Sequence, residues 1–298
     1  MSNFISTIKQ TSSPIFWVYE VAAKLSSITL TEMENDTNLL YTSLSNSVDL
    51  FNLPAICTSF DTTLEAVSLG CNISQNEGYV NSVVDAFNID VDSVVTNGRI
   101  PMILDVISRL SASLNCSVLG SISCPKILSN YLLSSSGNQD EDTIEELFFV
   151  IGEVLSSLTN SYLDSGADGI VLLAPDGLYP ENPFYMNSLS SLSNVLSHYE
   201  ASGTIVTRQT SPNDIKAAAN LGFDLITGST TSPIESLSTS IDSNISFGIG
   251  IPENLFSSDQ SKLDQFINSI PPKTILSSEW TIPVSTPVEL IQYLSNTK

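Results

Sequence analysis

Residues 114–133, LNCSVLGSISCPKILSNYLL, contain the pattern that decides the fold. A short run at 116–119 is typical of a strand, and 120–124 predict a tight turn. From Pro125 onward, apolar residues recur at helical spacing, at Ile127, Leu128, Tyr131 and Leu132. Proline suits the first turn of a helix, because its missing N–H would have no partner there. The stretch therefore predicts a strand, a turn and a helix, the repeating unit of α/β folds, in which strand ends expose functional side chains.

The same alternation continues along the whole chain. Short apolar runs predict strands at 14–23, 53–58, 116–119, 169–174, 203–206, 225–227, 245–251 and 274–277. Helical spacing between them includes the runs 31–46, 100–114, 143–164, 213–220, 261–270 and 287–294. Eight strands alternating with helices favour α/β architecture, in the form of a single (β/α)8 TIM barrel. We assign residues 1–298 to this one barrel, with 1–13 as a flexible tail and 134–142 as a mobile loop.

The charge of the chain excludes one class of partner. There are 32 Asp and Glu residues against 10 Lys and Arg, so the formal net charge is −22. Without a basic stripe, binding to nucleic acid phosphates is not expected. Self-repulsion of this size is screened by concentrated salt, which suggests a halophilic cytoplasm, and an ordinary acidic protein is the alternative. We find no signal peptide and no apolar run near the ~20 residues that cross a bilayer, which predicts a cytoplasmic location without membrane contact.

Metal-binding residue types are few and dispersed. The four cysteines, Cys57, Cys71, Cys116 and Cys124, form no CxxC pair, and the single histidine, His198, lies far from all of them. Buried reduced thiols are the expected state of these cysteines. His198, near a helix end, is predicted to be a solvated surface group. The sequence therefore predicts no metal site and no cofactor.

Four stretches, spread over nearly the whole chain, each carry a sequence motif. They are Phe60-Asp61 with Glu65-Ala66 and Leu69-Gly70; Arg99-Ile100-Pro101 with Val118-Leu119-Gly120, Pro125 and Tyr131; YLDSGADGI at 162–170; and ILSSEWTIPVSTP at 275–287. Together they resemble the uroporphyrinogen decarboxylase superfamily, which also contains methylcobamide:coenzyme M methyltransferases. The resemblance implies a (β/α)8 barrel with its site at the carboxyl ends of the strands.

The resemblance also implies catalytic roles for Asp61 and Tyr131. They match the aspartate that lies beneath the pyrrole nitrogens in the decarboxylase and the tyrosine near it. The decarboxylase's first-strand arginines, which hold substrate carboxylates, are replaced here by Tyr19 and Ala23. The zinc ligands of the methyltransferase branch are replaced as well, by Thr207-Arg208-Gln209 and by Glu279 or Trp280.

Arg208, Gln209 and Trp280 are the predicted ligand-binding residues. A guanidinium at the end of a barrel strand is suited to bind an anion, and an indole can stack on a planar ligand. Structural interpretations stay open: Arg208 in a salt bridge, Trp280 and Tyr131 in core packing, and Asp61 as a helix N-cap.

Three functions are consistent with these residues. The first is a cofactor-independent, carboxy-lyase-like enzyme acting on a tetrapyrrole, a corrinoid or another planar anionic ligand. In it, Asp61 handles a proton or stabilises charge, and Arg208 anchors a carboxylate. The second is a non-catalytic barrel that binds such a ligand or a corrinoid protein, and the third is a methyltransferase without the usual zinc triad. A homodimer is a further possible assembly. The fold by itself does not choose between them.

Overall fold

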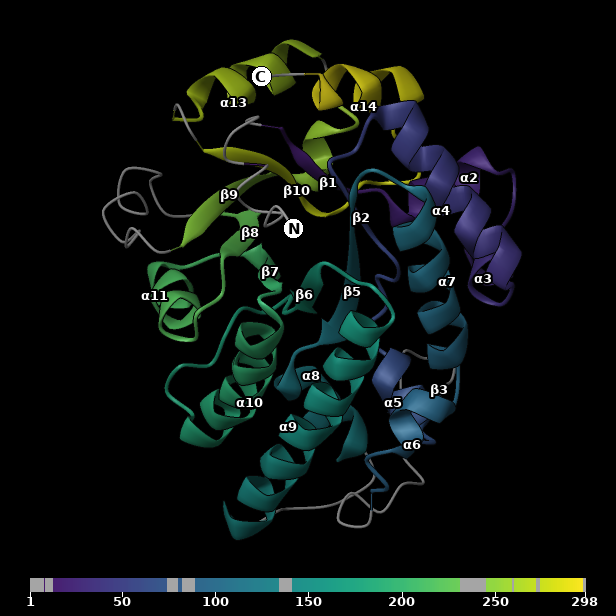
Figure 1. The fold of residues 1–298 in the computed structure, drawn as a ribbon. Coiled ribbons are helices and arrows are strands. Elements are labelled where there is room, and N and C mark those ends of the chain that lie inside the picture. Colours follow the sequence, from purple (N-terminus) through teal and green to yellow (C-terminus); the bar gives the residue numbers. More distant parts are fainter. Residues whose placement is uncertain are drawn as a thin grey trace.

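The computed structural model describes residues 8, 13–73, 80–81, 89–133, 141–230, 245–258, 260–271 and 274–296. Within these residues, eight strands form one parallel sheet in the order β1-β10-β9-β8-β7-β6-β5-β2 (Figure 1). The strands are β1 (Ile15–Trp17), β2 (Ala55–Cys57), β5 (Ser117–Ser123), β6 (Gly169–Leu173), β7 (Ser202–Gln209), β8 (Leu225–Ser229), β9 (Ser246–Ile251) and β10 (Ile275–Thr281). The end strands β1 and β2 contact each other without a hydrogen-bonded ladder. The sheet is therefore a nearly closed (β/α)8 barrel, which confirms the predicted fold class.

Helices cover the outside of the sheet, as Figure 1 shows. They are α2 (Tyr19–Leu25), α3 (Leu30–Glu34), α4 (Thr37–Phe51), α5 (Leu64–Ser68), α6 (Ser93–Thr96), α7 (Ile100–Ser113), α8 (Pro125–Leu132), α9 (Glu141–Asp164), α10 (Pro183–Tyr199), α11 (Pro212–Asn220), α13 (Gln260–Ser269) and α14 (Val288–Ser295). A 3-10 turn, η1 (Glu253–Leu255), and a two-stranded sheet of β3 (Asn72–Ile73) and β4 (Val80–Asn81) complete the described elements. None of the described helices is both long and apolar enough to cross a membrane.

The β5–α8 unit follows the predicted pattern with one difference. Helix α8 begins at Pro125 as expected, but β5 continues to Ser123, through residues that the sequence predicts as a turn. Serine is common in turns, so this segment resembles a turn when only the sequence is considered. The hydrogen-bond partners of its serines are distant in sequence and become visible only in the fold. Ser121 forms a hydrogen bond with Ser59 (2.5 Å between the Oγ atoms), and Ser123 binds Glu65. Polar residues in this strand thus find hydrogen-bond partners inside the fold.

Two other boundaries differ from the prediction. The apolar run 14–23 is not one strand, because β1 ends at Trp17 and α2 begins at Tyr19. Tyr19 and Ala23, predicted on the first strand, are therefore buried helix residues. The predicted helix 31–46 is two helices, since Asp36 accepts hydrogen bonds from the N–H groups of residues 38 and 39 and caps α4. The predicted tail and mobile loop lie largely outside the described residues; of the loop, Glu141 and Asp142 begin α9.

Two apolar clusters make up the core of the barrel. One cluster fills the space between the helices and the outer face of the sheet. The other fills the barrel interior with Ile8, Ile15, Trp17, Ala55, Cys57, Leu119, Val171, Leu173, Val206, Leu225 and Ile275. All four cysteines are free thiols, three of them buried and Cys116 half-buried. The interior is thus a packed core, and ligand-sized space is found near the carboxyl ends of the strands.

Candidate functional site

A pocket of about 670 Å³ opens at the carboxyl ends of the strands, and we call it the mouth pocket. Asp61, Arg208 and Trp280, three residues singled out in the sequence, line it together. The full lining is Leu30, Thr31, Glu34, Asn35, Phe60, Asp61, Thr62, Thr63, Val67, Arg99, Pro175, Arg208 and Trp280. The volume lies within the range of pockets that hold drug-sized ligands.

Irregular strand pairing accompanies Arg208 and Trp280 at the rim. The register of β7 against β8 shifts between Val206 and Gln209, so Arg208 lies within an irregular segment. The pairing of β10 with β1 shifts over the segment that contains Trp280. Such bulges interrupt the strict inward and outward alternation of side chains and re-aim residues next to functional sites. Both side chains reach the mouth pocket from strands with this irregularity.

An aromatic wall forms one side of the mouth pocket. Phe60 packs edge-on against Trp280, with ring centroids 4.9 Å apart, and also contacts Trp17 at 5.8 Å. The Arg208 guanidinium lies over the Trp280 ring, 5.0 Å from its centroid. An arginine stacked on an indole keeps its donor edge available for an anion while its face is supported.

Arg208 forms no ion pair with any carboxylate in the part of the chain that the structure describes. The interpretation of this residue as half of a salt bridge is therefore not supported. The acidic residue next to Trp280, Glu279, is engaged elsewhere, accepting hydrogen bonds from the Ser229 hydroxyl (3.0 Å) and the Glu253 N–H (3.1 Å). In a chain with 32 acidic residues, an arginine without a carboxylate partner at a pocket is a candidate anion site.

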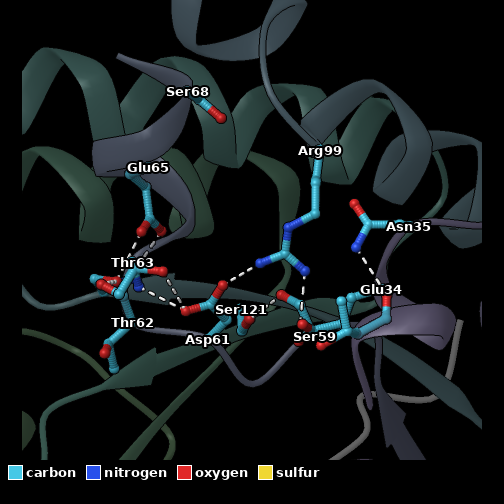
Figure 2. A network of polar contacts seen from close by, with 12 residues as sticks. Glu34, Asn35, Ser59, Asp61, Thr62, Thr63, Glu65, Ser68, Arg99 and Ser121 are labelled. Atoms are coloured by element: carbon cyan, nitrogen blue, oxygen red, sulfur yellow. Dashed lines mark hydrogen bonds and ion pairs between the residues drawn. The ribbon is translucent and has the colours of Figure 1, made fainter. Parts of the chain in front are cut away.

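Opposite charges meet on another side of the pocket, where Arg99 pairs with both Asp61 and Glu34 (Figure 2). The Arg99–Glu34 distance is 3.4 Å between Nη1 and Oε1, and Arg99 Nη2 contacts Asp61 Oδ2. Burial lowers the pKa of Arg99, but the charges of Glu34 and Asp61 outweigh it and hold the pKa above its ordinary value. The cluster has two carboxylates and one guanidinium, so it carries one excess negative charge.

Local structure fixes each member of this cluster. Asp61 Oδ1 accepts hydrogen bonds from the Thr63 N–H (2.8 Å) and hydroxyl (2.7 Å), an Asx-turn that leads into α5. The N-cap of α5 is Thr63, so the N-cap interpretation of Asp61 is wrong in position. Arg99 precedes α7 and follows Gly98, whose φ of +59° and closeness to Ser68 suit glycine.

Glu34 ends the short helix α3, which begins with a capping box between Thr29 and Glu32. Its only ion-pair partner among the described residues is Arg99. Burial raises the pKa of Glu34 above its ordinary value, even though Arg99 lowers it. The buried hydroxyl of Tyr19 is close enough that the charge of Glu34, after burial itself, raises the pKa of Tyr19. The Glu34 carboxylate is thus incompletely compensated.

A third carboxyl group, Glu65, lies near this cluster but is completely buried. It accepts hydrogen bonds from the Ser123 N–H (2.9 Å) and is joined to the Ser123 hydroxyl (2.7 Å). Burial raises the pKa of Glu65 to about 7, against the opposing effect of these hydrogen bonds. Figure 2 shows Glu65 and Asp61 on the same segment, turned to different partners.

The structure does not bring every predicted residue into the mouth pocket. Gln209 lines a separate polar pocket of about 300 Å³ with Asp176, Glu181 and Asp214. Tyr131 is half-buried on α8, packs against the core, and is not among the residues lining the mouth pocket.

The sequence interpretation did not assign a site role to Arg99, Glu34, Phe60 or Glu65. Arg99 does carry one sequence cue, because a cation at the start of a helix is unfavourable for the helix dipole unless acids compensate it. Glu34 and Asp61 supply that compensation, but both come from other parts of the chain.

Donors for a zinc ion do not converge in the described part of the chain. No group of three or more His, Cys, Asp or Glu side chains there has the geometry to hold a metal ion. Thr207 at the position of a family zinc ligand is hydrogen-bonded to Thr210 (2.7 Å between hydroxyls), and Glu279 is held by its own partners. These residues do not fit zinc, because a threonine hydroxyl and a carboxylate already held by its own partners do not form a tetrahedral ligand set.

Comparisons with known proteins support the fold. No protein-family model matches the sequence, and no curated protein matches it. Among solved structures, the chain is similar to a methyltransferase from Methanosarcina mazei, with a TM-score of 0.73, 18% identity, and 95% of this chain and 92% of that chain covered. It is also similar to a B12-independent methionine synthase from Shewanella, with a TM-score of 0.52, 9% identity, and 87% and 85% covered. At these identities the likeness defines a class, TIM barrels of the kind found in these two proteins, and nothing finer.

Proposed function

We propose that the mouth pocket binds a small planar anion, with Arg208 holding its carboxylate and Trp280 and Phe60 contacting its flat face. The observation that carries this proposal is that Arg208 has no carboxylate partner among the described residues, although the chain is strongly acidic. A charge-assisted hydrogen bond from such a guanidinium stabilises a bound carboxylate by about 1.5–3 kcal/mol, with the low end expected for an exposed arginine.

Isothermal titration calorimetry with two probes tests this proposal. Indole-3-propionate carries a carboxylate on an aromatic ring system, and indole-3-propionamide is its neutral counterpart. We expect Arg208→Gln to weaken binding of the acid by about tenfold, which corresponds to about 1.4 kcal/mol, and to leave the amide unchanged. Lys216→Gln removes one positive charge from an exposed position on α11 and is the matched control. Equal binding of the acid to wild type and Arg208→Gln would contradict the proposal.

If the ligand is turned over, Asp61 acts through its charge rather than as a free base. Thr63 and Arg99 already occupy both of its oxygens. A carboxylate fixed in this way stabilises a positive charge that develops beside it without reorganising. We therefore expect Asp61→Asn to abolish turnover while leaving ligand binding largely intact.

A tetrapyrrole or corrinoid is the finer form of this hypothesis. Its support is that the aromatic rings of Phe60 and Trp280 and the guanidinium of Arg208 line the same pocket. Uroporphyrinogen itself fits less well, because its eight carboxylates would meet Arg208 as the one lining arginine not already paired with acids. Buried carboxylates without partners cost several kcal/mol each. A Soret band in the absorption spectrum of the purified protein would support a bound tetrapyrrole.

Methyl transfer without a zinc triad is the second candidate function. The observation in its favour is the similarity in fold to a methyltransferase over nearly the whole chain. Incubation with methylcobalamin and a thiol, followed by the absorbance of the demethylated cobalamin, tests it. A binding role towards a corrinoid protein, or a homodimer, is a third expectation that size-exclusion chromatography of mixtures can test.

A further inference from the structure

We propose that the ligand of the mouth pocket is a zwitterion, whose carboxylate binds Arg208 and whose ammonium group binds Glu34. This inference rests on the proposed function, since it assigns a second charged group to the same ligand. It adds a residue, Glu34, and a chemical class, small amino acids or amino-acid-like molecules with an aromatic or other flat side chain.

The pocket lining has one uncompensated positive charge and one uncompensated negative charge. Arg208 is one unit of positive charge without an acidic partner in the described ranges of the chain, and the cluster of Glu34, Arg99 and Asp61 is one unit of negative charge in excess. A ligand with a single negative charge would satisfy the first and leave the second exposed to a partly desolvated pocket. A zwitterion satisfies both, which is the electrostatic complementarity that favours specific binding.

Of the two carboxylates, Glu34 is the one available for an ammonium group. Asp61 already has three contacts, two hydrogen bonds from Thr63 and the ion pair with Arg99. Glu34 has a single ion pair at 3.4 Å, and its side chain is 18% exposed. A carboxylate in these surroundings has lost most of its water, and what compensates it is a cation shared with Asp61 and the neutral hydroxyl of Tyr19. A second cation delivered by a ligand would restore that loss.

The aromatic wall supports the same class of ligand. Phe60 and Trp280 line the pocket together with Glu34 and Arg208 and pack edge to face. Aromatic faces attract organic cations as well as flat rings, so the wall suits both the ring and the ammonium group of such a ligand. The pocket also offers the volume for a molecule of this size.

Three probes with the same indole ring separate the contributions. L-tryptophan carries both charges, indole-3-propionate only the carboxylate, and tryptamine only the ammonium group. By titration calorimetry, we expect L-tryptophan to bind wild type at least fivefold more tightly than either of the others. Glu34→Gln is expected to remove the advantage of L-tryptophan over indole-3-propionate, and to leave the affinity for indole-3-propionate unchanged or higher.

Glu146→Gln, the same chemical change at an exposed position of α9, is the matched control and should leave all three affinities unchanged. The inference is overturned if indole-3-propionate binds wild type as tightly as L-tryptophan, or if Glu34→Gln preserves the preference. Those results would leave the proposed function standing as long as Arg208→Gln still weakens indole-3-propionate. Loss of the Arg208 effect, by contrast, contradicts the proposed function itself.

Discussion

Asp61 and Glu65 are four residues apart, yet their surroundings treat a carboxyl group in opposite ways. Asp61 lies at the pocket, where Arg99 supplies a positive charge. Glu65 is completely buried, and its partners are the hydroxyl and N–H of Ser123, neither of them charged. Asp61 lies beside a cation, whereas burial without a charged partner raises the pKa of Glu65 and favours its neutral form. The fold thus places a charged carboxylate at the mouth pocket, and four residues later in the sequence it buries a carboxyl group without a charged partner.

The hydrogen bonds of Ser123 show how a neutral Glu65 is accommodated. The Ser123 Oγ atom lies 2.9 Å from the Thr62 carbonyl and 2.7 Å from Glu65 Oε2, but one hydroxyl proton serves only one acceptor. If Glu65 is protonated, its O–H donates to Ser123 and Ser123 donates to Thr62. Every polar atom in this chain of contacts then has a partner, which is the arrangement that burial requires.

The largest expected effect comes from removing the cation from the mouth cluster. Arg99→Met leaves Glu34 and Asp61 as two neighbouring carboxylates without compensation, and we expect a loss of about 3 kcal/mol in the free energy of unfolding. Urea denaturation at pH 7.5 measures it. Arg109→Met, within α7, removes the exposed ion pair with Asp105, a hydrogen bond to Asn38 and a stacking contact with Tyr41, and should cost about 1 kcal/mol or less. A loss below about 1 kcal/mol for Arg99→Met would contradict the importance of this cluster.

The next effect has the opposite sign and depends on pH. Because the pKa of Glu65 is raised to about 7 in the fold, ionising it costs stability as pH rises from about 4.5, its ordinary value, through 7. The full shift corresponds to at most about 3 kcal/mol. Glu65→Gln keeps the shape and the hydrogen bonds without the charge, so we expect it to stabilise the protein by about 2 kcal/mol at pH 8 and by almost nothing at pH 4.

Denaturation of wild type and Glu65→Gln across this pH range checks that prediction. A constant difference between the two proteins from pH 4 to pH 8 would show that Glu65 does not change its protonation on folding. The comparison between the two carboxyl groups would then be wrong for the buried one.

A smaller effect is expected at Asp61. Asp61→Asn retains the carbonyl oxygen that Thr63 binds but loses the charge that faces Arg99, and we expect a loss of about 1 kcal/mol. Combined with Arg99→Met, it should cost less than the sum of the two single changes, because the repulsion with Glu34 also disappears. Strict additivity in this double-mutant cycle would mean that the two residues are not coupled.

The smallest change in stability is expected at Glu34. Since burial raises the pKa of this carboxyl despite Arg99, its ionised form contributes little to the fold. We expect Glu34→Gln to alter the free energy of unfolding at pH 8 by less than about 0.5 kcal/mol, in the stabilising direction. Thermal unfolding measures it, and a large loss of stability would assign Glu34 a structural role instead of a ligand-binding one.

Most of the barrel was predictable from sequence because its repeating unit is local. The strand within 169–174 is predicted by a continuous apolar run. Helix α7 is predicted by apolar residues three and four positions apart, which form the face that packs against the core. The errors arose where a side chain's partner is distant. The sequence predicts a turn at Ser121 and Ser123. In the structure both lie in a strand, because Ser59 and Glu65 are their hydrogen-bond partners. Likewise, the apolar run 14–23 contains no signal for the boundary between β1, which ends at Trp17, and α2, which begins at Tyr19.

The mouth pocket was predictable only in part, for a related reason. Asp61, Arg208 and Trp280 each follow or end a strand, and barrel topology brings such positions to one rim. Glu34 and Arg99 are not near strand ends, and the ion pair between them joins two parts of the chain that are 65 residues apart in sequence. Gln209 shows the limit of adjacency, since it neighbours Arg208 in sequence but lines a different pocket.

A crystal structure of the protein soaked with L-tryptophan tests the central claim most directly. The account predicts density in the mouth pocket, with the carboxylate on Arg208, the ammonium group on Glu34 and the ring against Trp280. Density in the separate groove lined by Tyr179, Pro183 and Phe184, with none in the mouth pocket, would contradict it.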